Sequence, residues 1–396
     1  MQLTLRNASV KELFAELKEQ QQRKVDLIVP ARDLWSHNGL AVVANAGETK
    51  MDDNGVSRGP LYLAPSNVYD EGMVEKLRVD GSSMGIKLVR GLRTTGRTDL
   101  VDSLYNGMLH GNKELNVPGD ERKFFLRTFS PAAPGQTGYA RALLSNSYRP
   151  IDNWDVLNSV IEGMTAAGLD SHVVKQADLT DRRMYLKIVV PEINALAPEF
   201  LRDYVAPYSK KRGAEIPTVF AGFVIKNGET GGSAFTITPE LTFEVCDNGM
   251  TVTEDMVRKT HLGAKVEDEG VVKISEKTRK LNLDFVQSYT KDSITSFLDV
   301  GYMERVLRRL TEQAGGQVKH PQAVVETIVK RAAFSDEDAE GIMNAFIDGG
   351  DRTKGGMLQA VTSYSQTVAD PDHAYEIEAD ALAATGFSKI GDKAYA

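Results

Sequence analysis

Two strand-like runs near the middle of the chain constrain its fold more than any other feature. Residues 234–245 alternate apolar and polar side chains, residues 219–226 are mostly apolar, and the segment that joins the two runs begins with Asn227-Gly228. An Asn-Gly step between two alternating runs is typical of a β-hairpin, because both residues accept the positive φ of a tight turn. The sequence therefore predicts an antiparallel sheet in this part of the chain.

Segments with a helical apolar period lie on both sides of this hairpin. Before it, helices are predicted at residues 10–17, 69–77, 83–92, 99–109 and 153–168, and strands at 25–29, 40–44, 123–129, 139–144, 171–175 and 183–190. After it, helices are predicted at 302–313, 321–333, 336–347, 353–368 and 374–384. Ser335 and Asp338 have the spacing of a helix cap, and the polar segment 47–59 is predicted to be a loop. The pattern indicates an α+β fold, an antiparallel sheet backed by helices, with helical N-terminal and C-terminal regions.

A polar segment at residues 111–122 is the best candidate for a linker. A chain of 396 residues is long enough for two or three ordinary domains. We therefore expect an N-terminal mixed, mainly helical region at 1–112, a central α+β domain at 121–300 and a C-terminal helical region at 301–396.

The amino-acid composition indicates in which environment the protein works and which partners it can bind. The sequence has no apolar run near the ~18 residues that span a bilayer and does not begin like a signal peptide, so no membrane partner is expected. Its single cysteine, Cys246, excludes an intramolecular disulfide and fits a reducing cytoplasm. The formal net charge of −8 lowers the expectation of nucleic-acid binding, although a local basic groove is compatible with it.

Four segments carry a set of motifs in a fixed order. Residues 141–153 read RALLSNSYRPIDN and include Ser145, Asp152 and Asn153. A glycine-containing hairpin follows at 226–233, and then VCDNGM at 245–250, which contains Cys246, Asn248 and Gly249, with His261 a short way beyond. The fourth segment is the predicted helix around residues 357–364. Together these segments resemble the phage- and plasmid-borne family called domain of unknown function 932, whose motifs are RAxLSxxYRxxDN, VCxNGM and NAxTxYA.

The resemblance covers residues 77–384 and implies a mobile-element origin, in the cytoplasm of a bacterial host, without a defined activity. The chain departs from the family pattern at Asp247, where Thr or Gln is usual, and at Gln359, where Asn is frequent. The first ~75 residues match nothing in the family, so the resemblance says nothing about them.

No enzyme motif stands out. Cys246 could act as a nucleophile with His261 as its base. The spacing matches no nucleophile motif, however, and the Asn-Gly step favours a turn that ends a strand at Cys246. The six histidines have no pair at ligand spacing, and the chain contains no phosphate-binding loop. No metal and no cofactor are expected.

Nucleic-acid contacts are the remaining candidate. Tyr148 and Arg149 follow a predicted strand just before a helix, where tyrosine could stack on a base and arginine could bind phosphate. The alternative is that Tyr148 packs, Arg149 pairs with Asp152, and Asp152 or Asn153 caps the helix.

Three groups of cations add to this candidate. They are Lys210, Lys211 and Arg212 in a predicted loop, Arg258 and Lys259 after the VCDNGM segment, and Arg305 and Arg309 on one helix face. If they converge, they form a groove for a phosphate backbone. Solvated surface charge is the ordinary alternative.

A curved antiparallel sheet backed by a helix is also the arrangement of phage single-strand annealing proteins of the Rad type, a fold-level analogy. The sequence therefore favours a non-enzymatic phage protein that binds or anneals single-stranded DNA in recombination or replication, and that could form a homo-oligomer. One alternative is an interaction protein that inhibits or modulates a host protein, which the acidic stretch at 336–340 favours mildly. The other is a metal-dependent nuclease.

Overall fold

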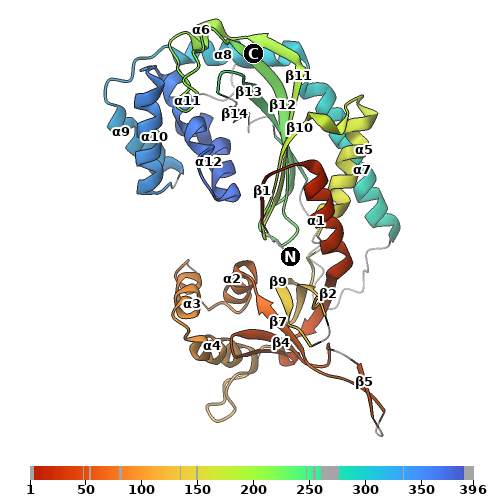
Figure 1. The fold of residues 1–396 in the computed structure, drawn as a ribbon. Coiled ribbons are helices and arrows are strands. Elements are labelled where there is room, and N and C mark those ends of the chain that lie inside the picture. Colours follow the sequence, from red (N-terminus) through yellow and green to blue (C-terminus); the bar gives the residue numbers. More distant parts are fainter. Residues whose placement is uncertain are drawn as a thin grey trace, which may run out of the picture.

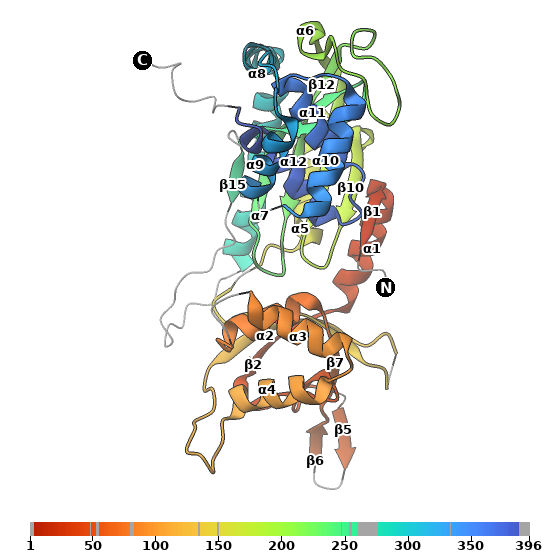
Figure 2. The ribbon, with the colours of Figure 1, turned by 90° about the vertical axis from the view of Figure 1, so that its left-hand side faces the viewer.

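The computed structural model describes residues 4–47, 49–52, 55–79, 83–133, 135–148, 150–246, 248–252, 256–259, 276–332 and 334–387. These residues form two lobes, each built on its own sheet (Figures 1 and 2). The lobe that contains the predicted hairpin is called the large lobe here, and the other is called the small lobe. The predicted α+β class is confirmed.

The sheet of the large lobe is antiparallel throughout. Its strands lie in the order β1 (Leu5–Ala8), β10 (Val174–Leu179), β11 (Met184–Leu196), β12 (Thr218–Asn227), β13 (Phe235–Phe243) and β14 (Asn248–Thr251), and β15 (Val257–Lys259) also pairs with β13. The predicted hairpin is β12–β13, with Ile225 opposite Ile237. The predicted strand at 171–175 begins instead with a short 3-10 helix at Ser171–Val173.

Helices α1 (Val10–Arg23), α5 (Asn153–Ala166) and α7 (Glu276–Phe297) cover one face of this sheet (Figure 1). Their apolar side chains share a core with the strands, in which Leu13, Val160 and Val286 meet Phe223 and Phe235. The last of these helices was not predicted, because its sequence carries polar residues on nearly every turn.

The opposite face is covered by α11 (Lys354–Ser365) and α12 (Pro371–Ala384), beside α9 (Pro321–Ala332) and α10 (Asp336–Gly349). The short α6 (Pro198–Leu201) and the longer α8 (Val300–Ala314) lie at the end of the sheet away from the small lobe (Figure 1). Ser335 and Asp338 form the predicted capping box at the start of α10. The five predicted C-terminal helices are therefore confirmed.

The small lobe is built on a mixed sheet. Its order is β2 (Lys24–Pro30), β8 (Lys123–Phe129), β9 (Gly138–Ser145), β7 (Leu61–Pro65), β4 (Leu40–Val43) and β3 (Leu34–His37), with only β7 and β9 parallel. Helices α2 (Asn67–Lys76), α3 (Met84–Thr94) and α4 (Thr98–His110) belong to this lobe, and a core around Leu63, Tyr69 and Tyr105 joins them to the sheet. Strands from both sides of the segment 111–122 build this one sheet.

The predicted loop at 47–59 is wrong. Strands β5 (Thr49–Asp52) and β6 (Gly55–Arg58) pair only with each other and project from the small lobe (Figure 1). The two strands, TKMD and GVSR, lack the apolar alternation by which strands are recognised in a sequence.

The path of the chain makes the small lobe an insertion. Strand β1 and helix α1 belong to the large lobe, the chain enters the small lobe at β2, and it returns after β9 to form α5 (Figure 1). Among the described residues, no helix has the length and apolar character needed to cross a bilayer.

Candidate functional site

The first two family-like segments meet in a buried ionic network between the lobes. Arg127 on β8 is fully buried, and its guanidinium donates to Asp152 at 2.6 Å and to the carbonyl oxygen of Glu229 at 2.7 Å. Lys24 Nζ lies 2.6 Å from the other Asp152 oxygen, and Arg141 pairs with the Glu229 carboxylate. The network therefore joins β2, β8 and β9 of the small lobe to α5 and the β12–β13 turn of the large lobe.

The opposite charges keep both buried carboxylates ionised. Burial alone would raise the pKa of Asp152, but the charges of Arg127 and Lys24 outweigh burial and lower it to about 2. Burial opposes ionisation of Glu229 as well, and Arg141 with Arg127 lowers its pKa below the ordinary value. Each buried carboxylate therefore has cations beside it, which a buried charge needs in order to be tolerated.

The predicted capping role of Asp152 is wrong. Asp152 occupies the N-cap position of α5, but its side chain makes no capping hydrogen bond, because its oxygens bind Arg127 and Lys24. The backbone N–H of Asn153 instead donates to Glu229 Oε2 at 2.8 Å. The side chain of Asn153 accepts from Asn227 Nδ2 at 2.8 Å, so the cap of α5 comes from the β12–β13 turn.

The third and fourth family-like segments also meet. Cys246 follows β13 and is half-buried. Its Sγ lies 3.9 Å from Oε1 of Gln359, which is buried on α11. The chain turns at residues 244–246, directly after β13, and Asn248 and Gly249 belong to β14. A turn therefore follows the strand as predicted, but the Asn-Gly step that was expected to form it lies in the next strand. His261 lies outside the described residues, and the proposed Cys246–His261 pair is not tested.

The side chain of Tyr148 packs against the small lobe, whereas the residues just before it are exposed or partly exposed. The Tyr148 ring packs beside Ala142 and Leu144, its hydroxyl donates to the Gly228 carbonyl at 3.4 Å, and burial raises its pKa to about 12. Ser145 is exposed, with its Oγ 3.2 Å from that of Ser147. Arg149 lies outside the described residues.

The predicted cations do not all converge. Arg258 and Lys259 lie on β15 opposite Thr236 and Phe235, at the start of β13. The segment with Lys210, Lys211 and Arg212 lies between α6 and β12, near the end of β13. The start and the end of β13 are about 27 Å apart, at 3.4 Å per residue. The two groups therefore lie at opposite ends of the sheet.

Residues 205–212 form an ordered hairpin-like loop. Val205 and Arg212 form an antiparallel bridge, the Ala206 N–H donates to the Lys211 carbonyl at 2.9 Å, and the Lys210 N–H donates back to the Ala206 carbonyl at 2.9 Å. Lys210 Nζ lies 3.2 Å from Asp348. Lys211 and Arg212 are exposed and form no ion pair with any carboxylate in the described part of the chain.

This loop also presents an aromatic side chain that sequence reasoning missed. The Tyr208 side chain is exposed, with 60% of the residue accessible to solvent. An exposed aromatic ring close to cations is the usual composition of a single-strand nucleic-acid site. The signal was present in the sequence, since Tyr208 precedes three consecutive cations by two residues.

Helix α8 brings two more arginines to the same end of the sheet (Figure 2). It packs against α6 and the sheet through Met303, Val306 and Leu310, while Arg305 and Arg308 are exposed and Arg309 is half-buried. We call Tyr208, Lys210, Lys211, Arg212, Arg305 and Arg308 the cationic end.

A second buried ion cluster lies between the sheet of the large lobe and α12. Lys187 Nζ is 3.4 Å from Glu240 Oε1 and 3.2 Å from Glu378 Oε2. Burial raises the pKa of Glu240 to about 7, and the nearby Glu378 raises it as well, although the charge of Lys187 lowers it. The single Lys187 ammonium thus lies between two carboxylates. The adjoining cavity holds only about 20 Å³, so it has no room for a substrate.

Within the described ranges, no group of three or more His, Cys, Asp or Glu side chains is arranged to hold a metal ion. The sequence matches no protein-family model, no curated protein and no solved structure. The family resemblance therefore remains a prediction based on the four motifs.

Proposed function

We propose that the protein binds single-stranded DNA, without catalysing a reaction, through the cationic end. The observation that carries this proposal is the ordered loop on which Tyr208 is exposed beside Lys211 and Arg212. The origin in a phage and the cytoplasmic setting of a bacterial host remain part of the proposal, because both rest on the family resemblance.

The chemistry of the loop favours single strands over duplexes. A base stacked on an exposed aromatic ring contributes roughly 1–3 kcal/mol regardless of sequence. In a duplex the base faces are already stacked, so Tyr208 would find no partner there, while Lys211 and Arg212 would bind phosphates of either form. The antiparallel sheet with α5 and α7 on one face agrees with the annealing-protein analogy, which is a likeness of arrangement only.

Fluorescence anisotropy of labelled single-stranded and double-stranded oligonucleotides, over a salt series, tests the proposal. The wild type should prefer the single strand, and binding should weaken steeply with salt as counterions are released. Tyr208→Ala should weaken single-strand binding by roughly 5- to 150-fold, the equivalent of one lost stack. The double variant Lys211→Gln/Arg212→Gln should reduce the salt slope by about 1.4, or about 0.7 for each lost phosphate contact.

The matched control removes two exposed lysines from α1, as Lys11→Gln/Lys18→Gln, and leaves the net charge equal to that of the loop variant. This control should bind like the wild type. Equal losses in both double variants would mean that only overall charge matters, and flat curves for the wild type at low salt would refute DNA binding. Host-protein binding and metal-dependent nuclease activity are the alternatives, and neither predicts a difference between the two double variants.

A further inference from the structure

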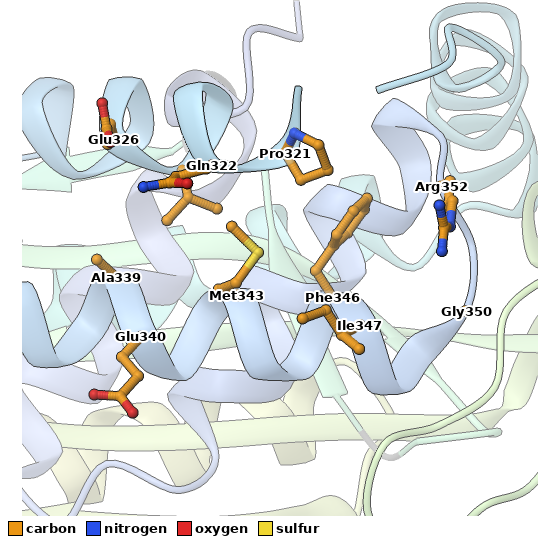
Figure 3. A pocket seen from close by; sticks show the side chains of 11 residues that line it. Pro321, Gln322, Glu326, Ala339, Glu340, Met343, Phe346, Ile347, Gly350 and Arg352 are labelled. Carbon is orange, nitrogen blue, oxygen red and sulfur yellow. The ribbon is translucent and has the colours of Figure 1, made fainter. Parts of the chain in front are cut away.

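An apolar groove opens between α9 and α10, with a volume of about 680 Å³ (Figure 3). Both helices line it at helical spacing, α9 through Pro321 and Val325 and α10 through Ala339, Met343 and Ile347. Although it is a large aliphatic side chain, Ile347 is 66% exposed. Apolar side chains one and two turns apart on two neighbouring helices are the usual seat of a third helix.

The two ends of the groove carry opposite charges. Glu326 and Glu340 lie at one end, and Arg352 lies at the other (Figure 3). The first turn of α10, next to the acidic end, adds Asp336 and Glu337. A helix that docks here should therefore present a cation beside its apolar side chains at the end that meets Glu340.

Helix α3 of the small lobe has this composition on its outer side. Leu88 is 53% exposed and Met84, one turn before it, is 71% exposed, while Val89 is buried in the lobe. Lys87 is exposed beside Leu88.

The charge and length of α3 also match the groove. The helix contains three cations and no carboxylate, and Arg90 and Arg93 pair with Glu71 and Asp70 of α2, although the Arg90 side chain is 46% exposed. Lys87, beside Leu88, is the cation of α3 that is exposed and forms no ion pair with another described residue. The eleven residues of α3 are about 16 Å long, and the lining of α10 from Ala339 to Ile347 spans about 12 Å.

We propose that α3 of one copy of this chain docks into the α9–α10 groove of a second copy, with Leu88 and Met84 against Met343 and Ile347 and with Lys87 toward Glu340. Each copy carries both halves of the contact, because the groove lies on the large lobe and α3 on the small lobe. One helix in one groove belongs to the small end of specific interfaces, so self-association should be weak, with a Kd of roughly micromolar order. The groove and α3 share no residue with the cationic end, although Asp348, next to the groove residue Ile347, pairs with Lys210. The test uses the protein without DNA, so its outcome does not depend on the proposed function.

Sedimentation of the full chain, from about 1 to about 100 µM to bracket a micromolar Kd, tests the proposal. The average mass of the wild type should rise above that of the monomer with concentration. Leu88→Glu removes the α3 half, and Ile347→Glu removes the groove half. Both side chains are more than half exposed, so both variants should fold, and each alone should remain monomeric. The control Leu115→Glu changes a 73% exposed leucine elsewhere and should associate like the wild type.

A mixture of the two variants gives the decisive result. Leu88→Glu keeps an intact groove and Ile347→Glu keeps an intact α3, so together they should form a one-to-one heterodimer and nothing larger. Lys87→Glu should weaken the association at least several-fold, and mixing it with Glu340→Lys should restore pairing. A wild type that stays monomeric would overturn the proposal and leave the groove to a different protein. Association that persists in both single variants, or a mixture that does not pair, would overturn it as well.

Discussion

The buried Arg127 network gives the sharpest test of what holds the two lobes together. Arg127→Met keeps most of the side-chain length but removes the charge that lies between Asp152, Glu229 and Asp26. Of the cations in the network, Lys24 would remain beside Asp152 and Arg141 beside Glu229, which also keeps the backbone N–H of Asn153. Removing one partner from a buried ion pair costs about 3–5 kcal/mol, because the remaining charge is buried without compensation.

Urea unfolding can assign this loss to the lobes, because each lobe contains one of the two tryptophans. Trp35 lies on β3 of the small lobe and Trp154 on α5 of the large lobe. In Trp35→Phe and Trp154→Phe backgrounds, the remaining fluorescence reports one lobe at a time. When Arg127 is present, we expect the two lobes to unfold at the same urea concentration. In Arg127→Met, we expect them to unfold at different urea concentrations.

The control is Arg97→Met, which breaks an ion pair with Asp99 whose side chains are 55% and 62% exposed. Exposed pairs contribute about 0–1 kcal/mol, so this variant should unfold almost like the wild type. If Arg127→Met lowered the free energy of unfolding by less than about 1 kcal/mol at neutral pH, the network would not be the main connection between the lobes.

The same network makes the stability of the protein depend on pH. The folded-state pKa of Asp152, about 2, lies below the unfolded value of about 3.9. Its stabilising contribution is therefore present above pH about 4 and is lost as the pH falls toward about 2. Arg127→Met should lose less stability over this range than the wild type, since Asp152 has then already lost its strongest partner.

Three further predictions concern single positions. Gly72→Ala should destabilise the small lobe by about 1–3 kcal/mol in urea unfolding, because its Cβ would lie 2.4 Å from the Leu143 carbonyl oxygen. Gly107→Ala, at an open position of α4, should stabilise the lobe by up to about 1 kcal/mol. Equal effects of the two substitutions would contradict the packing of α2 on β9. Glu240 has a folded-state pKa raised to about 7, so its contribution is present below pH about 4.5 and is lost as the pH rises toward 7; Glu240→Gln should flatten the stability curve over that range, and an unchanged slope would assign it to another group. Ser335→Ala removes the cap of α10 and should lower the thermal midpoint by the equivalent of about 0.5–2 kcal/mol, whereas an unchanged midpoint would mean that α10 does not need its cap.

Local patterns predicted the elements that are defined by their own residues. The β12–β13 hairpin was predicted from its two strand-like runs and the Asn-Gly step, although the positive φ angles in its loop belong to Gly231 and Gly232. Helices α8 through α12 follow from their apolar period. The turn after β13 and the cap at Ser335 are local as well. Each depends on contacts within a few residues, which a sequence displays directly.

Contacts between distant segments could not be predicted in this way. Arg127 and Glu229 are 102 residues apart, and nothing near either one shows that they are partners. The same limit explains the error at Asp152, where a local role was expected and two distant cations take both oxygens. The cationic loop was half predicted, since Lys210 to Arg212 were recognised and the exposure of Tyr208 could be seen only in the fold.

The insertion of the small lobe has a consequence for how the protein is made. Strand β1 pairs with β10, so during synthesis β1 must wait for a partner that lies about 170 residues later in the chain, while β2 to β9 can already close the small lobe. At 5–20 residues per second this delay is roughly 10–30 seconds. During it, the apolar side of α1 has no sheet to cover. The nascent chain should therefore be most vulnerable to proteases and chaperone capture at β1 and α1, before β10 and β11 emerge.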